Sequence, residues 1–196
     1  DEQEISPELR EKYLSITLDK AERLEDLINE FFEITRFNLS TVTLEYSSID
    51  LAVLLGQLRF EFMPMLREKE LGCSLTAPET MPIRCDAGKV RRVFDNLLRN
   101  AVLYSYPGTE IKINAVLDGG SAVVSVVNSG ATIPEEKLKR IFEQFYRLDA
   151  ARSSAGGAGL GLAIASQIVQ LHGGTISARS ADDTTEFTVT LPVGKS

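Results

Sequence analysis

Cysteine and histidine are scarce in this chain of 196 residues, and their scarcity excludes two classes of protein. Cys73 and Cys85 are the only cysteines, and His172 is the only histidine. Two cysteines are too few for the disulfide framework of a small secreted domain, and neither stands near a second Cys or His at the spacing of a zinc site. We therefore expect two reduced thiols in or near the core of an intracellular protein.

Long apolar runs and an excess of positive charge are also missing. No apolar run approaches the roughly 18 residues that a membrane-spanning helix needs, and no signal peptide opens the chain. The 21 Lys and Arg face 28 Asp and Glu, and the resulting charge of -7 argues against binding to a nucleic-acid backbone. We expect a soluble chain without nucleic-acid or membrane contacts. Because it opens on Asp1 rather than Met, we also expect a piece of a longer protein.

The first 40 residues carry the pattern of one long amphipathic helix. Ser6, Pro7 and Glu8 have the side chains expected at a helix start. Apolar residues then recur at steps of three and four to about Asn38: Leu9, Tyr13, Ile16, Leu24, Leu27, Phe31 and Ile34. Since no other segment offers a helix of similar length, this stripe is predicted to dock on another chain or on a segment outside this sequence. Residues 1–40 are thus predicted to form an association element.

From residue 41 onward, short strands and helices interleave. Strands are predicted at 41–46, 72–77, 81–86, 110–117, 121–128, 174–180 and 186–192, and helices at 51–66, 87–104, 134–140 and 159–171. Pro64 is expected to kink the first of these helices near its end. Antiparallel hairpins without a regular βαβ rhythm predict the α+β class, with a two-layer α/β sandwich as its architecture.

A row of polar side chains marks the helix predicted over 87–104. Asn96, Asn100 and Tyr104 are four residues apart and lie in one line next to the apolar stripe, and Arg92 extends the line. Asn is a mediocre helix former, so a row of two in mid-helix favours a functional role. A solvated face with incidental Asn remains the alternative.

The stretch "SSAGGAGLGLAIA" from residue 153 places several glycines before a helix. Bare backbone N–H groups and the helix dipole suit a phosphate. No Gly-Lys-Ser/Thr follows, which excludes a Walker A loop, and Leu162 stands where a dinucleotide fingerprint needs a third small residue. A phosphate site and a flexible loop that feeds a core helix both remain open.

Two further segments lie between these features. Asn128, Ser129 and Gly130 end a strand in a turn where the backbone can approach a ligand closely. A following loop interleaves aromatic and basic residues: Phe142, Phe145, Tyr146, Arg147 and Arg152. The plain interpretation of this loop is that its aromatic side chains pin it to the core, and the arginines can meet phosphate in addition.

The order of these parts resembles the Bergerat-fold (GHKL) ATPases, and among them the catalytic domain of the sensor histidine kinases of two-component systems. "NLLRNAVLYS" resembles the N box, "NSGATIP" the first glycine box, "IFEQFYRLD" the F box, "GAGLGLAIA" the second glycine box and "HGG" the turn after it. The likeness covers residues 41–196, and residues 1–40 resemble the second helix of the family's dimerisation hairpin. The wording of both parts is most similar to the vancomycin-resistance group of these kinases.

The resemblance implies a role for each matching position. Asn100 would coordinate the Mg²⁺ that bridges the ATP phosphates, and Asn96 would support the same catalytic site. Tyr104 would stack on adenine, Asn128 would face its amino group, and Gly130 would let the backbone pass the base. Residues 131–158 would form a mobile lid, and phosphate contacts would come from Gly157, Gly159, Leu160, Gly161 and the side chain of Arg147.

Two features depart from the family: the residues of the first glycine box and the missing phosphoacceptor histidine. Asn128 stands where the first glycine box normally has Asp, and Thr132 replaces its second glycine. A neutral acceptor is expected to weaken nucleotide binding by about 1 to 2 kcal/mol unless another group compensates. His172 sits at a predicted helix end, where a packing or capping role is expected. The chain therefore lacks a phosphoacceptor histidine, and we expect that it cannot autophosphorylate.

As a function, the resemblance implies an ATP-binding kinase domain that transfers the γ-phosphate to a histidine for relay to a response-regulator aspartate. It further implies a homodimer in the longer protein and a place on the cytoplasmic side of a bacterial membrane sensor. One alternative is a dimerisation and regulator-docking module whose nucleotide site has decayed. Another is a different Bergerat ATPase, such as a chaperone, a topoisomerase or a serine-directed anti-sigma kinase.

Overall fold

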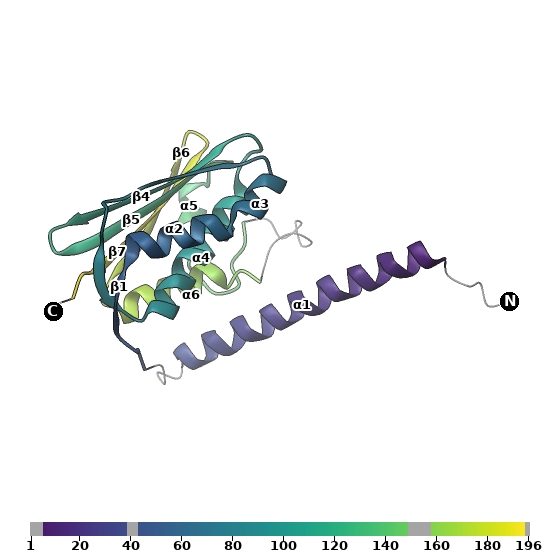
Figure 1. The fold of residues 1–196 in the computed structure, drawn as a ribbon, viewed down its shortest axis with the longest axis horizontal. Helices are drawn as coiled ribbons and strands as arrows, with labels where there is room; N and C mark the ends of the chain where they lie inside the picture. The colour runs from purple at the N-terminus through teal and green to yellow at the C-terminus, as the bar shows by residue number, and fades with distance from the viewer. Residues whose placement is uncertain (1–5, 39–42, 149–157, 195–196) are drawn as a thin grey trace. The chain divides into compact units, whose positions relative to one another are not determined.

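The computed structural model describes residues 6–38, 43–148 and 158–194. Two compact units make up the chain, Asp1–Thr41 and Val42–Ser196 (Figure 1). No helix in these described ranges combines the length and the apolar character needed to cross a membrane.

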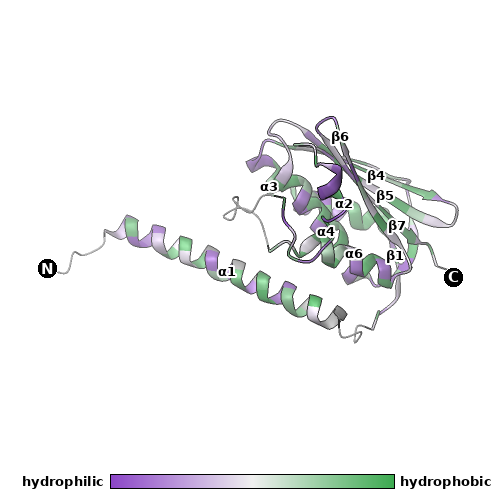
Figure 2. Cartoon of the chain, turned by 180° about the vertical axis from the view of Figure 1, so that it is seen from behind, coloured by the Kyte–Doolittle hydropathy of each residue, from purple (hydrophilic) through white to green (hydrophobic). Residues whose placement is uncertain are grey.

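The first unit is one helix, α1 (Pro7–Asn38), and it confirms the helix predicted from the Ser6-Pro7 start. The Ser6 hydroxyl accepts a hydrogen bond from the Leu9 N–H at 3.3 Å, which caps the helix as expected. Apolar residues recur along the whole length of α1 in Figure 2. Many of them are exposed: Leu9, Tyr13, Leu14, Ile16, Leu18, Leu24, Ile28, Phe31 and Phe32.

The second unit is built on a five-stranded sheet with the order β2-β4-β5-β7-β6. The strands are β2 (Gly72–Thr76), β4 (Glu110–Asp118), β5 (Ser121–Ser129), β6 (Thr175–Ala181) and β7 (Thr184–Pro192). The helices that lie along one face of the sheet are α2 (Leu51–Glu61), α4 (Ala87–Tyr104) and α6 (Gly161–Leu171) (Figure 1). This is the two-layer α+β architecture that the sequence predicts.

Both predicted hairpins are confirmed, and the sheet adds a parallel pair. β4 and β5 pair antiparallel across a turn at Gly119 and Gly120, and β6 pairs with β7 in the same way. β2 runs parallel to β4, which makes the sheet mixed. Every second residue is buried along β5 and β7, and in β4 from Ile111 to Ala115, as expected for strands with one face against helices.

The core lies between the sheet and the α4–α6 layer. Its largest fully buried side chains include Phe94, Leu97, Ile113, Ile164 and Phe187. Asp86 caps α4 by accepting a hydrogen bond from the Lys89 N–H at 3.1 Å.

Both cysteines are free thiols. Cys85 is buried and Cys73 is half-buried, and burial raises the pKa of each thiol to about 11. The thiols are therefore protonated near neutral pH.

One predicted strand is wrong and another predicted element is divided. The strand expected at 41–46 begins later, as β1 (Ser47–Asp50), which pairs antiparallel with β3 (Pro82–Cys85); residues 41 and 42 lie outside the described ranges. The Glu45 N–H donates to the Asp86 carboxylate at 3.1 Å instead of to a strand.

The helix predicted at 51–66 is divided into two. α2 ends at Glu61, and a separate helix, α3 (Met63–Glu68), follows. Pro64 lies in the first turn of α3, where a missing N–H costs least.

Two helices are shorter than predicted. The segment from Pro134 forms only α5 (Glu135–Leu138), and α6 begins at Gly161 instead of Gly159. Gly159 has a φ of +77°, a left-handed conformation that is incompatible with the first turn of a helix. The α6 start therefore lies two residues after the predicted one.

His172 ends α6 as a buried packing residue, which confirms that expectation. It is 6% exposed, and its Nε2 accepts a hydrogen bond from the Asp86 N–H at 3.1 Å. Its Nδ1 lies 2.8 Å from the Ile168 carbonyl oxygen, and the Tyr46 ring packs edge-on against the imidazole. Although burial opposes ionisation, N–H groups of Glu45 and Lys89 lower the pKa of the Asp86 carboxyl. Asp86 thus joins α4, the segment before β1 and the end of α6.

Candidate functional site

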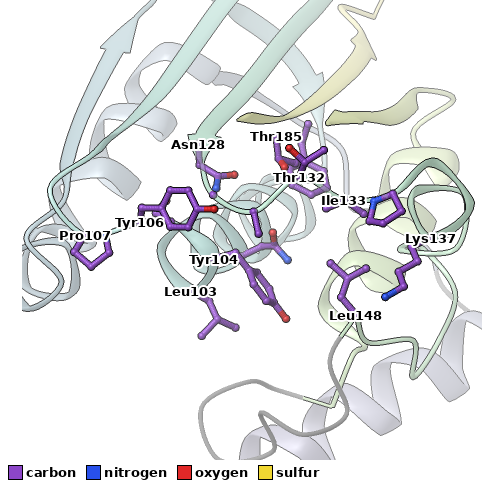
Figure 3. A pocket seen from close by; sticks show the side chains of 16 residues that line it. Leu103, Tyr104, Tyr106, Pro107, Asn128, Thr132, Ile133, Lys137, Leu148 and Thr185 are labelled. Carbon is purple, nitrogen blue, oxygen red and sulfur yellow. The ribbon is translucent and has the colours of Figure 1, made fainter. Parts of the chain in front are cut away.

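A pocket of about 420 Å³ opens where α4, β5 and β7 meet the loop that follows β5 (Figure 3). Four of the predicted nucleotide-site residues line it, Asn100, Tyr104, Asn128 and Gly130, and so does Thr132, which departs from the family pattern. The structure therefore brings together side chains from the asparagine row and from the turn after β5. The remaining lining residues are apolar or uncharged and polar, with the exception of Lys137.

Asn128 and Thr185 form the strand side of the pocket. They are Cα partners in the antiparallel register of β5 and β7, and both are buried, Asn128 at 3% exposure. The preceding inward positions of β5 hold Ala122, Val124 and Val126, so Asn128 places an amide where the strand otherwise buries apolar groups. The Thr185 hydroxyl lies 2.9 Å from the Ser180 hydroxyl. Buried polar groups at a strand end are typical of a ligand site.

The asparagine row of α4 spans from the pocket to the start of α6. Asn100 and Tyr104 line the pocket, whereas Asn96 is buried one turn earlier at 6% exposure. A Cβ built on Gly161 would lie 3.3 Å from the Asn96 Oδ1, so this amide rests against the first turn of α6. The Asn96 Nδ2 has no hydrogen-bond partner among the described residues. Such an orphaned buried amide is unusual in a purely structural site.

Two of the predicted glycines are required by close approach of the backbone. A Cβ on Gly130 would overlap the Tyr104 carbonyl oxygen, while the Gly130 N–H donates to the Asp183 carbonyl at 2.8 Å. A Cβ on Gly159 would lie 2.7 Å from the Tyr146 carbonyl oxygen. These glycines therefore let two chain segments pass each other, whatever ligand they also admit.

The other predicted phosphate residues are placed differently. The side chain of Leu160 is fully buried in the core, so only its backbone could face a ligand. Arg147 is half-buried and is not among the pocket residues, although its neighbour Leu148 is. Gly157 and Arg152 lie outside the described residues. The phosphate roles of these positions stay predictions.

The loop after β5 is held to the β6–β7 hairpin. The Thr132 hydroxyl accepts a hydrogen bond from the Asp183 N–H at 2.9 Å, and the Ile133 N–H donates to the Ser180 hydroxyl at 2.9 Å. Farther along, the Phe142 ring packs against core Phe187 with centroids 6.4 Å apart. The loop is thus pinned by an aromatic side chain, as its plain interpretation predicts. Thr132 also has a structural task that a glycine could not perform.

Sequence reasoning gave no individual role to most of the lining residues, among them Thr185, Ile133 and Lys137. Thr185 becomes visible only when the β5–β7 register is known, because nothing in the local pattern of β7 marks it. Ile133 and Lys137 lie on the loop and on α5, and their side chains point toward the pocket in Figure 3. For Lys137, the one available signal is a basic residue soon after the Gly-containing turn.

The model of one protein family, described as histidine kinase-, DNA gyrase B-, and HSP90-like ATPase, matches residues 85–195. The match covers more than half of the chain and includes the α4 row, the pocket strands and α6. The chain belongs to this ATPase family. The resemblance drawn from the N box and the glycine boxes is thereby confirmed, as is the GHKL ATPase fold.

Within this ATPase family, the chain is similar to sensor kinases. It is 48% identical to sensor protein VanSC of Enterococcus gallinarum over 193 residues, which are 98% of this chain and 53% of that protein. The chain thus spans about half the length of that curated relative. The predicted likeness to the vancomycin-resistance group agrees with this match.

Two solved structures of histidine kinases share the fold. Full-length ShkA in complex with AMPPNP is 26% identical, with a TM-score of 0.85 over 99% of this chain and 41% of that one. Histidine kinase ThkA in complex with the response regulator TrrA is 25% identical, with a TM-score of 0.79 over 98% and 54%.

The donors that the site offers suit Mg²⁺ better than a transition metal. Asn side chains supply amide oxygens, which hard cations prefer, and Mg²⁺ commonly takes few protein ligands and fills its shell with water and phosphate oxygens. Groups of three or more His, Cys, Asp or Glu that could hold a metal are absent from the described ranges. Asn100 at the pocket, with the buried Asn96 amide behind it, fits an ion held jointly with a ligand.

Proposed function

We propose that this chain is the ATP-binding catalytic part of a sensor histidine kinase, with residues 41–196 as the catalytic domain. The observation that carries the proposal is the pocket that unites Asn100, Tyr104, Asn128 and Gly130 from two distant sequence boxes. Membership of the ATPase family and the likeness to ShkA, which was solved in complex with AMPPNP, support it.

The adenine end of the ligand is assigned to the strand side of the pocket. There the Asn128 amide oxygen accepts from the exocyclic amino group, and the neighbouring Thr185 hydroxyl offers a second polar contact. The Tyr104 ring provides a flat surface for the base. Because Asn128 is neutral, this contact is weaker than one to a carboxylate.

The phosphate end is assigned to α4 and the start of α6. The Asn100 amide oxygen would hold Mg²⁺, and Asn96 would support it from one turn earlier. Bound there, the ion would supply positive charge that offsets the charge of the transferring phosphoryl group. Backbone N–H groups of Gly157, Gly159, Leu160 and Gly161 face the phosphates, with Arg147 as the cation for the γ-phosphate.

The γ-phosphate is proposed to pass to a histidine outside this chain. A phosphoacceptor imidazole needs a free ring nitrogen, and His172, the only histidine, is buried with Nε2 accepting from Asp86 and Nδ1 close to the Ile168 carbonyl. We infer that the chain alone does not autophosphorylate. Base-stable, acid-labile radiolabel on the isolated chain after incubation with γ-labelled ATP would overturn this inference.

The proposed kinase function also implies partners for the longer protein. Residues 1–40 would be the second helix of a dimerisation hairpin, and the exposed apolar residues of α1 would meet a homodimer partner. A response-regulator receiver domain would accept the phosphoryl group on an aspartate. The structure of ThkA in complex with the response regulator TrrA supports this class of partner. The whole is proposed to be the cytoplasmic part of a bacterial membrane sensor.

Calorimetric titration with ATP and ADP, with and without Mg²⁺, tests the proposal. Wild-type chain is expected to bind more tightly with Mg²⁺, and Asn100→Ala is expected to abolish the Mg²⁺-dependent gain. Asn114→Ala on β4, an exposed position whose amide donates to the Ser125 hydroxyl at 3.4 Å and which does not line the pocket, is the matched control and should bind like wild type. If wild type binds no nucleotide at all, a docking module with a decayed site becomes the better interpretation.

A further inference from the structure

One side chain supplies the formal charge of the pocket lining. Of the 16 residues that line it, only Lys137 carries a formal charge. The whole chain has a net charge of -7, so its overall field disfavours the approach of an anion. Any local attraction for a charged ligand within the pocket lining must therefore come from Lys137.

Lys137 is placed to act on the contents of the pocket. It lies on α5, where its N–H donates to the Pro134 carbonyl at 2.9 Å, and its side chain is half-buried. Figure 3 shows the side chain running toward Leu148, on the side of the pocket that faces Tyr104. A half-buried ammonium is screened less by salt than an exposed one.

The neighbouring cations of the same segment are engaged elsewhere. Lys139 pairs with Glu135 at 3.2 Å, and Arg140 pairs with Glu143 at 3.0 Å and stacks over Tyr146 at 4.5 Å from the ring centroid. Within the described residues, Lys137 makes no ion pair. Its three N–H donors are thus available to a ligand.

We propose that Lys137 is a binding residue for the phosphate groups of the nucleotide, so that the pocket selects nucleotides over nucleosides from its loop side. This inference rests on the proposed nucleotide function. Apart from Asn100, which is assigned to Mg²⁺, the other lining side chains offer neutral hydrogen bonds and apolar contact, which a nucleoside satisfies as well as a nucleotide does. Among the lining side chains, Lys137 is the one that can make a direct charge-assisted contact to a phosphate group, which adenosine lacks.

The test compares adenosine, ADP and ATP by calorimetry on the full chain, in wild type and in Lys137→Gln. Lys137→Gln is expected to weaken ADP and ATP binding about tenfold, as for loss of one charge-assisted contact, and to leave adenosine binding unchanged. Lys137→Arg should restore most of the ADP affinity. Raising the salt concentration should weaken ADP binding less in Lys137→Gln than in wild type.

Lys139→Gln is the matched control, because it removes the same charge directly after the end of α5, at an exposed ion pair. It is expected to change ADP affinity by less than about twofold. An equal loss of adenosine and ADP affinity in Lys137→Gln, or no loss of either, would overturn this inference while the nucleotide function stands. Failure of wild type to bind any of the three ligands would overturn both.

Discussion

The pocket has two walls that are held in different ways. The strand wall consists of Asn128 at the end of β5, Gly130 directly after β5 and Thr185 near the start of β7, and all three are buried. The loop wall consists of residues 131–134, Lys137 and Leu148, which are attached through hydrogen bonds of Thr132 and Ile133 to the β6–β7 hairpin. The strand wall is therefore tied to global stability, whereas the loop wall can change its contacts at small cost to the fold.

Gly130→Ala should break the strand wall and have the largest effect. Its Cβ would overlap the Tyr104 carbonyl oxygen, so β5 and α4 must separate. We expect a loss of about 2 to 4 kcal/mol in the free energy of unfolding, measured by urea denaturation.

The control for this prediction is Gly56→Ala in α2, where a Cβ meets nothing within 4 Å. Since Ala is the better helix former, this variant should match or exceed wild-type stability by up to about 1 kcal/mol. Equal stabilities of Gly130→Ala and Gly56→Ala would contradict the view that the strand wall is locked to the core.

Asn128→Asp should sharpen the strand wall by restoring a charged acceptor. We expect unchanged or up to about tenfold tighter ATP binding in titration calorimetry, as a charge-assisted contact replaces a neutral one. Because the side chain is buried, the ligand-free variant should unfold at lower urea concentration than wild type. A clear loss of ATP affinity in a folded variant would mean that the adenine is bound elsewhere.

Thr132→Val should loosen the loop wall and have the smallest effect. The change keeps the shape and removes the acceptor of the Asp183 N–H. We expect a loss of about 0.5 to 1 kcal/mol, confined to the loop and the hairpin turn. Amide hydrogen exchange should report it as faster exchange at Asp183 with little change in the global unfolding midpoint; unaltered exchange at Asp183 would contradict this account of how the loop is held.

The sequence predicted the elements whose signals are local. The helix at 87–104 coincides with α4, because Asp86 caps it and its apolar spacing is regular. The strand at 41–46 failed, since β-branched residues indicate strand propensity and carry no information about a pairing partner. The parallel β2–β4 pair and the contact of Asn128 with Thr185 depend on sheet order and register, which a single sequence does not contain.

The candidate site divides in the same way. Asn100, Tyr104, Asn128 and Gly130 were predicted from motif order, and the structure brings these residues to one pocket. Lys137 was missed because its proposed role in phosphate binding follows from the absence of charge on the other lining residues. That absence is visible only once the pocket is assembled. The close approach of Gly130 to Tyr104 likewise joins residues that no local pattern relates.

The burial of His172 also has a practical consequence. Its ring contacts Asp86, Ile168 and Tyr46, so it lies where α4, α6 and the segment that precedes β1 converge. Because the chain contains no other histidine, its imidazole gives a single set of ring signals in a proton–carbon correlation spectrum. That one resonance serves as a built-in label for the junction where the chain enters the ATPase unit, and it can be followed during nucleotide titration without adding a probe.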